Sequence, residues 1–213
     1  MMKKSKNPIC VFWDDTVTIE QQKFIKKTIL ELLASIELDA SNLRIYGNYK
    51  FNIDGVKSQS FETILTQACI PQQNQVFWEK FVSFVFTKLP NSVLQEFIII
   101  FTNRDILSNT NGILYGAADS KLTLISFKRF VNKKEIIKTL IFHEVGHILG
   151  LPSMRRGEEN LAKIIGWHCI NPGCSMKQGM NIPEWQENTK SRLQQGAFPY
   201  CKECMEDLHQ LFN

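Results

Sequence analysis

The sequence has few histidines and no long run of apolar residues, and both shortages limit what the protein can be. Only 4 of the 213 residues are histidine. No apolar stretch approaches the length that crosses a bilayer, and the run at 9–13 is too short for a secretion signal. Internal repeats and low-complexity tracts are also missing from the sequence. We therefore expect a cytoplasmic protein that has no membrane partner.

Neither sign of charge is concentrated anywhere. The chain carries 25 basic and 21 acidic residues, a net charge of +4, and its short lysine runs contain no interleaved aromatic side chains. Such scattered charge predicts no nucleic-acid partner. In a reducing compartment, six cysteines favour metal binding over disulfides. With 44% apolar residues the chain can bury the core of one domain with a small appendage, and we expect a monomer.

Strand-like and helix-like segments alternate through most of the chain. Alternation and β-branched residues predict strands at 9–13, 43–51 and 97–101 and a hairpin within 113–130. Helical periodicity predicts helices at 20–36, 61–68, 76–86, 133–149 and 205–212. This order predicts an α/β (α+β) fold with a sheet of mixed direction.

The segment His143-Glu144-Val145-Gly146-His147 carries the strongest chemical signal. Histidines four residues apart lie on the same face of a helix, so both imidazoles can bind one cation while Glu144 faces the open coordination position. With so few histidines, chance would give this pattern in roughly a few of a thousand such sequences. We therefore predict a catalytic zinc, with Glu144 as the general base that takes a proton from water and passes it to the leaving amine.

A catalytic zinc usually has three protein ligands and a water, so a third ligand must come from elsewhere in the chain. His168 is the favoured candidate, because Gly150 offers a place where the helix can end and the chain can turn back. Glu158 or Glu159 is the alternative, since some zinc hydrolases use a later carboxylate.

Four cysteines form a second pattern after Gly150. Cys169, Cys174, Cys201 and Cys204 make two close pairs that suit a closed tetrahedral zinc, although a CxxC alone can also be a redox pair. Since glycine and proline recur here, we predict an N-terminal subdomain at 1–150, ending in the active-site helix, and a zinc-bound C-terminal subdomain at 151–213. Three other residues are expected in packing or surface roles: Cys10, Cys69 and His209.

Several of these residues occur together in one known pattern. They are Gly116-Ala117, Ser126, Arg129-Phe130, HEVGHILGL at 143–151, His168-Cys169, Cys174-Ser175-Met176, and Cys201 with Cys204. Over about 115–208 the sequence thus resembles the archaemetzincins, which are metzincin-type zinc peptidases with a second, four-cysteine zinc. The resemblance implies a zincin-like fold, two zinc ions, His143, His147 and His168 as ligands of the catalytic zinc, and Met176 as the methionine-turn residue.

The chain departs from the family pattern at one place. Ser153 stands where the family has its third histidine, and His168 comes 15 residues later, so the segment 152–167 is an insertion. The insertion could cover the cleft and restrict which substrates enter, or it could be an ordinary surface loop. The segment 122–127 resembles the edge strand along which metzincins bind an extended peptide, and a core strand without a substrate role fits it equally well.

The leading functional prediction is a zinc-dependent peptidase that acts on peptides or proteins, with aminopeptidase-like action as one option. A displaced third ligand also leaves open the alternative of an inactive zincin-like protein whose zinc sites support an interaction surface. A weaker alternative makes the four-cysteine zinc a nucleic-acid-binding ribbon.

Overall fold

The structure is a computed structural model that describes residues 8–48, 50–53, 56–70, 73–89, 91–163 and 166–212. Its centre is a five-stranded sheet in the order β10-β11-β7-β1-β2. Four strands run parallel: β1 (Ile9–Trp13), β2 (Leu43–Gly47), β7 (Phe97–Thr102) and β11 (Leu122–Ser126). Strand β10 (Gly116–Asp119) lies antiparallel to β11 at one edge. The predicted mixed α/β fold is confirmed.

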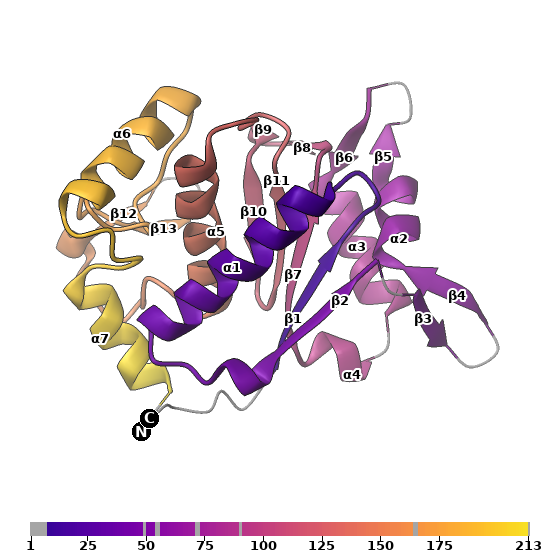
Figure 1. Ribbon diagram of the computed structural model, residues 1–213, viewed down its shortest axis with the longest axis horizontal. Coiled ribbons are helices and arrows are strands. Elements are labelled where there is room, and N and C mark those ends of the chain that lie inside the picture. The colour runs from indigo at the N-terminus through magenta and orange to yellow at the C-terminus, as the bar shows by residue number, and fades with distance from the viewer. Residues whose placement is uncertain are drawn as a thin grey trace.

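Helices cover both faces of this sheet, as Figure 1 shows. Ile99 and Phe101 of β7 pack in one hydrophobic cluster with α1 (Ile19–Ser35) and α5 (Lys134–Ile148). Ile98 and Ile100 pack in a second cluster with α2 (Phe61–Ala68) and α3 (Trp78–Lys88). Since both faces of β7 are buried, its sequence is a continuous apolar run rather than an alternating one.

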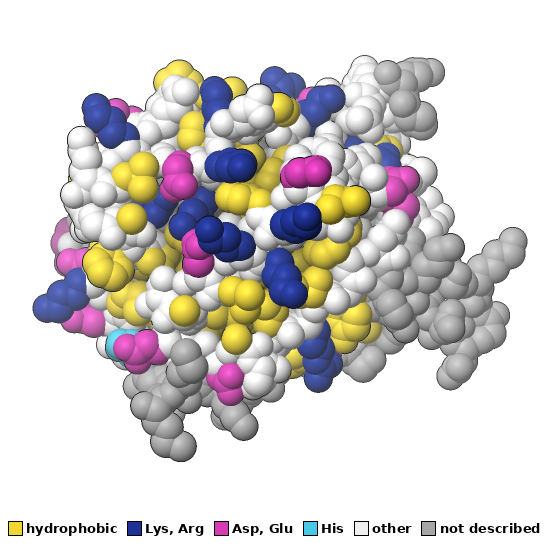
Figure 2. Space-filling view, viewed as in Figure 1, with side chains coloured by type: hydrophobic (Ala, Val, Ile, Leu, Met, Phe, Trp, Pro, Cys, Tyr) yellow, Lys and Arg dark blue, Asp and Glu magenta, His cyan; other side chains and the backbone are white. Residues whose placement is uncertain are grey.

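Helix α1 begins with a capping box, in which Thr18 Oγ1 accepts from Gln21 N and Gln21 Oε1 accepts from Thr18 N. Its outer face meets α5 through paired charges: Lys138 Nζ lies 2.6 Å from Glu31 Oε2. Figure 2 shows lysines and arginines interspersed with acidic and hydrophobic side chains on this face. The α1–α5 face therefore has mixed charge.

Shorter elements surround the main sheet. A four-stranded sheet has the order β5-β6-β8-β9, and two hairpins are formed by β3 with β4 and by β12 with β13. The bounds are β3 Lys50–Ile53, β4 Val56–Ser60, β5 Cys69–Ile70, β6 Gln75–Phe77, β8 Asp105–Ser108, β9 Gly112–Leu114, β12 Leu161–Lys163, β13 Trp167–Cys169, α4 Asn91–Leu94, η1 Ala40–Asn42 and η2 Glu158–Asn160. Among the described residues, no helix has both the length and the apolar character to cross a membrane.

Two helices, α6 (Ile182–Gln194) and α7 (Lys202–Leu211), follow α5 and lie on its side away from the main sheet (Figure 1). Sequence periodicity missed α6 and placed the start of α7 at residue 205. Trp185 and Leu208 from these helices belong to the same core cluster as Leu140 of α5. This cluster spans residue 150, and the division of the chain there remains a prediction.

Two other element predictions were wrong in their bounds. The strand expected at 43–51 is two strands in different sheets, because Gly47 has a positive φ of 62° and the chain leaves the main sheet there; Tyr49 lies outside the described residues. The helix expected at 76–86 begins at Trp78, because Gln75–Phe77 pairs with β8 as a strand.

The segment 122–127 is not an edge strand. Strand β11 lies between β10 and β7, and each of its residues is buried. The core-strand alternative is therefore correct for this segment. The edge of the sheet on this side is β10, which meets α5 along its length.

Candidate metal centre

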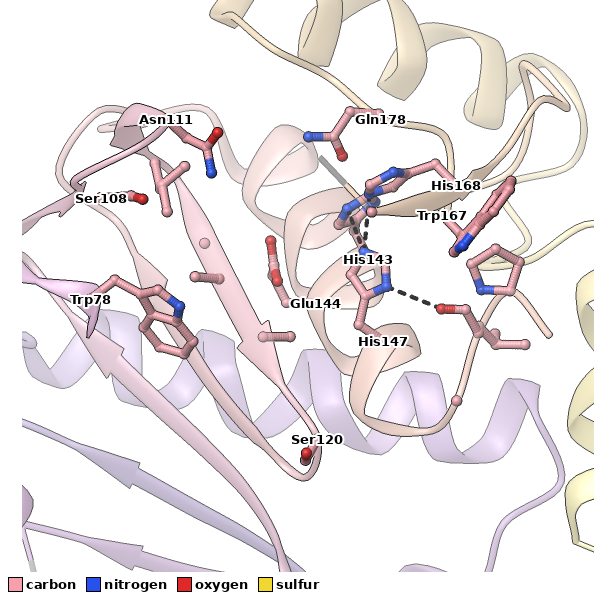
Figure 3. A pocket seen from close by; sticks show the side chains of 18 of the residues that line it. Trp78, Ser108, Asn111, Ser120, His143, Glu144, His147, Trp167, His168 and Gln178 are labelled. Atoms are coloured by element: carbon pink, nitrogen blue, oxygen red, sulfur yellow. Dashed lines mark hydrogen bonds between the residues drawn. The ribbon is translucent and has the colours of Figure 1, made fainter. Parts of the chain in front are cut away.

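Three histidines from two elements meet beside α5. His143 and His147 come from α5, and His168 comes from β13. The Nε2 atom of His147 lies 3.1 Å from His143 Nε2 and 3.2 Å from His168 Nε2 (Figure 3). In a tetrahedral site with Zn–N bonds of about 2.0–2.1 Å, two ligand nitrogens are about 3.3 Å apart. The histidines thus have the spacing of zinc ligands.

The orientation of the rings supports the same interpretation. His143 Nδ1 lies 2.7 Å from Ser175 O, and His147 Nδ1 lies 3.0 Å from Leu151 O. A carbonyl oxygen accepts, so each Nδ1 carries the proton and each Nε2 presents a lone pair. Two lone pairs at 3.1 Å repel each other unless a cation lies between them. The residues present therefore fit a zinc ion.

The helix end and the insertion bring the third histidine to this point. Gly150 has a φ of 91°, and the bonds Gly150 N to His147 O and Leu151 N to Gly146 O form a Schellman motif that ends α5. At the end of the insertion, β12 pairs antiparallel with β13, with Ala162 opposite His168. Glu158 and Glu159, the alternative ligands, are exposed, and neither belongs to the histidine group.

Burial keeps His143 and His147 neutral. It lowers the pKa of His143 well below its usual value, and charge on His147 or His168 would lower that pKa further. Burial also lowers the pKa of His147 to about 4. Neutral imidazoles can bind a metal without first losing a proton, so protons compete weakly for this site near neutral pH.

Glu144 lies against the edge strand, with its side chain buried. Its carboxylate packs where Gly116 has no side chain: a Cβ at Gly116 would lie 2.6 Å from Glu144 Oε1. Burial raises the pKa of Glu144 to about 8. The raised pKa makes this carboxylate a better proton acceptor than an exposed glutamate.

The four predicted cysteines also meet, and all four are free. Cys169 Sγ is 3.7 Å from Cys201 Sγ, and Cys174 Sγ is 3.6 Å from Cys204 Sγ. A disulfide would need about 2.05 Å, whereas tetrahedral Zn–S bonds of about 2.3 Å put the sulfurs about 3.8 Å apart. The neighbouring thiols donate to Cys169 and lower its pKa. This cluster fits a closed four-thiolate zinc.

Met176 lies under the histidine helix and is fully buried. A Cβ at Gly146 would lie 2.2 Å from Met176 Sδ, so the sulfur packs directly against the backbone of α5. This contact packs Met176 against the helix that carries His143 and His147, and its role as the methionine-turn residue remains a prediction.

A third group of possible metal ligands consists of acidic residues, and it needs no metal. Asp14, Asp15 and Glu62 surround the guanidinium of Arg104, at 3.1, 3.8 and 2.9 Å respectively. Arg104 already supplies a cation to these carboxylates, and we assign the group a structural role.

A cavity of about 460 Å³ opens above Glu144 and the histidines. One wall is β10 with Trp78, and the other includes Met154 and Trp167 from the insertion and its hairpin. Figure 3 shows Trp78 and Trp167 on opposite sides of the metal centre. Among the described residues that line it, the ionisable side chains are Glu144 and the three histidines. Sequence reasoning missed Trp78, β10 and Gln178 as cavity residues, because their positions depend on the fold and on no local motif.

Three solved structures share this fold. They are an archaemetzincin from Methanopyrus kandleri (TM-score 0.63, 13% identity, 96% of this chain and 94% of that one), an archaemetzincin from Archaeoglobus fulgidus complexed with malonate (0.58, 14%, 93% and 98%) and a zinc-dependent peptidase from Methanocorpusculum labreanum (0.58, 19%, 94% and 99%). No protein-family model and no curated protein matches the sequence. The likeness confirms, at the level of the fold, the predicted resemblance to the archaemetzincins.

Proposed function

We propose that this chain, whose fold is that of the archaemetzincins, is a zinc-dependent peptidase. One observation carries the proposal: the Nε2 lone pairs of His143 and His147 converge at 3.1 Å, beside a buried carboxylate and inside an open cavity. His143, His147 and His168 would hold the catalytic ion, and four cysteines would hold a second. The catalytic zinc, when bound, acidifies a water and stabilises negative charge on the substrate oxygen.

Glu144 is the residue of this chain that would transfer the proton in the reaction. Its carboxylate accepts a proton from the attacking water as the water oxygen bonds to the peptide carbon. As the C–N bond breaks, Glu144 returns that proton to the departing nitrogen, so the products are a carboxylic acid and an amine. The closed surroundings of Glu144 keep this proton at the carboxylate between the two steps.

Strand β10 is the proposed site of substrate binding. Its outer edge has no neighbouring strand in the main sheet, and Gly116 lies against Glu144. An extended peptide that adds to this edge through main-chain hydrogen bonds would pass directly over the carboxylate. The proposed substrate-binding edge is therefore β10, and not the segment 122–127 that the sequence suggested.

The inactive alternative depended on the displaced third histidine. The hairpin β12–β13 brings His168 to 3.2 Å from His147, which leaves that alternative without the feature that favoured it. The cytoplasmic location expected from the sequence remains a proposal.

Two measurements test the proposal. Zinc content per chain should be two in the wild type and one in His168→Ala; two ions in both proteins would exclude His168 as a ligand. A library of peptides with free and blocked N-termini should then be cleaved by the wild type and left intact by Glu144→Gln, which keeps its zinc. Equal turnover by the two proteins would refute Glu144 as the base, and the blocked peptides would distinguish endopeptidase from aminopeptidase action.

A further inference from the structure

Gln178 lies at the metal centre, beside His143 and Glu144. It comes two residues after Met176 and lines both the large cavity and a smaller adjoining one, together with His143 and Glu144. Figure 3 shows its amide next to the histidines, with the amide oxygen on the side that faces them. A side chain in this position can touch whatever binds above Glu144.

The amide oxygen of Gln178 has an unmet hydrogen-bonding capacity. Within the described part of the chain, Oε1 is buried and accepts no hydrogen bond of good geometry; the amide contacts the ring of His143, whose Nδ1 proton is already donated to Ser175 O. The amide nitrogen makes one weak contact, 3.7 Å to Met180 Sδ. Leaving a buried acceptor without a donor costs about 1–3 kcal/mol, so such groups are uncommon unless a ligand supplies the missing donor.

The backbone of Gln178 is nevertheless held firmly. Asn188 Nδ2 donates to Gln178 O at 3.0 Å and to Lys177 O at 3.4 Å. Gly179 packs on Trp185, where an added Cβ would lie 2.9 Å from the indole ring. Asn188 and Trp185 are both buried residues of α6. The helix thus fixes the backbone of Gln178 while the end of its side chain is left for a ligand, as in preorganised binding sites.

Two serine hydroxyls of the cavity already have hydrogen-bond partners. Ser108 Oγ donates to Glu79 Oε1 at 2.6 Å, and Ser120 Oγ donates to Asp119 Oδ1 at 3.2 Å. The group that fits an unpaired amide oxygen is an N–H donor, and the peptide backbone is rich in such donors.

We propose that Gln178 is a substrate-binding residue whose Oε1 accepts a hydrogen bond from a main-chain N–H of the peptide unit held at the metal centre. The peptide would then be bound on one side by β10 and on the other by Gln178. This inference rests on the proposed function, because the peptide unit is held there by the zinc.

The test uses two small hydroxamates on the zinc-loaded protein. Acetohydroxamate has an N–H beside its two metal-binding oxygens, and N-methylacetohydroxamate has the same oxygens without that N–H. Calorimetry should show that Gln178→Met weakens acetohydroxamate about fivefold and leaves the affinity for the N-methyl compound within about twofold. Lys177→Met, a change in the neighbouring residue, should alter neither affinity. Zinc content and melting temperature should match the wild type in both variants.

The outcomes are distinct. If Gln178→Met weakens both compounds equally or weakens neither, the inference is wrong and the peptidase proposal stands. If the wild type binds neither compound, the open zinc site is wrong, and both proposals are wrong with it. Should Gln178→Met fail to fold, the wild type alone decides, because equal affinity for the two compounds would overturn the role of the N–H.

Discussion

Two glycines set how closely the side chains of the metal centre approach the backbone. A Cβ at Gly146 would lie 2.2 Å from Met176 Sδ, and one at Gly116 would lie 2.6 Å from Glu144 Oε1. Both distances are far shorter than van der Waals contact. Met176 can therefore pack under α5, and Glu144 against β10, only because these two positions lack a side chain.

Gly146→Ala should destabilise the fold by about 1–3 kcal/mol, because the added methyl overlaps a fully buried sulfur. Urea unfolding of the zinc-loaded protein measures this cost. Met176→Ala provides the matched background, since it removes the overlapping sulfur. In that background Gly146→Ala should cost at least about 1 kcal/mol less. The same cost in both backgrounds would contradict the contact.

Gly116→Ala should lower kcat by about tenfold or more, since the new methyl must displace the Glu144 carboxylate. Zinc content should stay at the wild-type value, because Gly116 contacts no ligand of the proposed site. Ala118→Gly is the control on the same strand, and its kcat should stay within about twofold of the wild type. An unchanged kcat in Gly116→Ala would show that the position of Glu144 does not depend on this approach.

Elements built from apolar periodicity were predictable from the sequence, and helix α6, which holds the backbone of Gln178, was not. The helices at 19–35 and 134–148 show regular buried apolar positions, and their sequence patterns identified them. Helix α6 buries Asn188, Thr189 and Arg192, so it has no apolar stripe. The guanidinium of Arg192 finds its hydrogen-bond partners through tertiary contacts, with Thr139 Oγ1, Ala197 O and Glu135 Oε2. Its N-cap Asn181 and early proline were the remaining sequence signals.

The candidate site also has some features that the sequence predicts and others that depend on the fold. The spacing of His143 and His147 on one helix can be read from sequence, because a helix fixes the geometry of residues four apart. The edge position of β10 depends on strand order, and the position of the Gln178 backbone depends on its hydrogen bond with α6. Neither follows from local sequence.

The insertion is anchored to α7 by a buried ion pair. Arg156 Nη2 lies 2.7 Å from Asp207 Oδ2, and Ser153 N donates to the same oxygen at 2.9 Å. Asp207→Asn should cost about 2–4 kcal/mol in urea unfolding, because it leaves the guanidinium buried without its charge partner. Glu206→Gln, which breaks the exposed pair with Lys202 on the same helix, should cost under about 0.5 kcal/mol. Similar costs for both would mean that the insertion is not anchored there.

The two candidate metal sites are joined through the backbone. His168 precedes Cys169 on β13, and Cys174 precedes Ser175, whose carbonyl oxygen orients His143. Cys169 N also donates to Met176 O at 3.0 Å. One short stretch of chain therefore supplies ligands or ligand partners to both sites. Loss of the four-cysteine metal should free this stretch and weaken the histidine site.

Cys204→Ser tests this coupling, because Cys204 is fully buried, belongs to the cysteine group and comes from α7 rather than from the stretch that carries His168 and Ser175. We expect the variant to lose the structural ion, to melt about 10 °C lower or more, and to release its remaining zinc to a chromogenic chelator at least about tenfold faster. His147→Ala should lose one ion and keep the other firmly bound, because the cysteine site does not need the histidines. Cys69→Ser, which changes a cysteine outside both groups, should keep two ions. A Cys204→Ser protein that retains one ion with wild-type release kinetics would show that the two sites are independent.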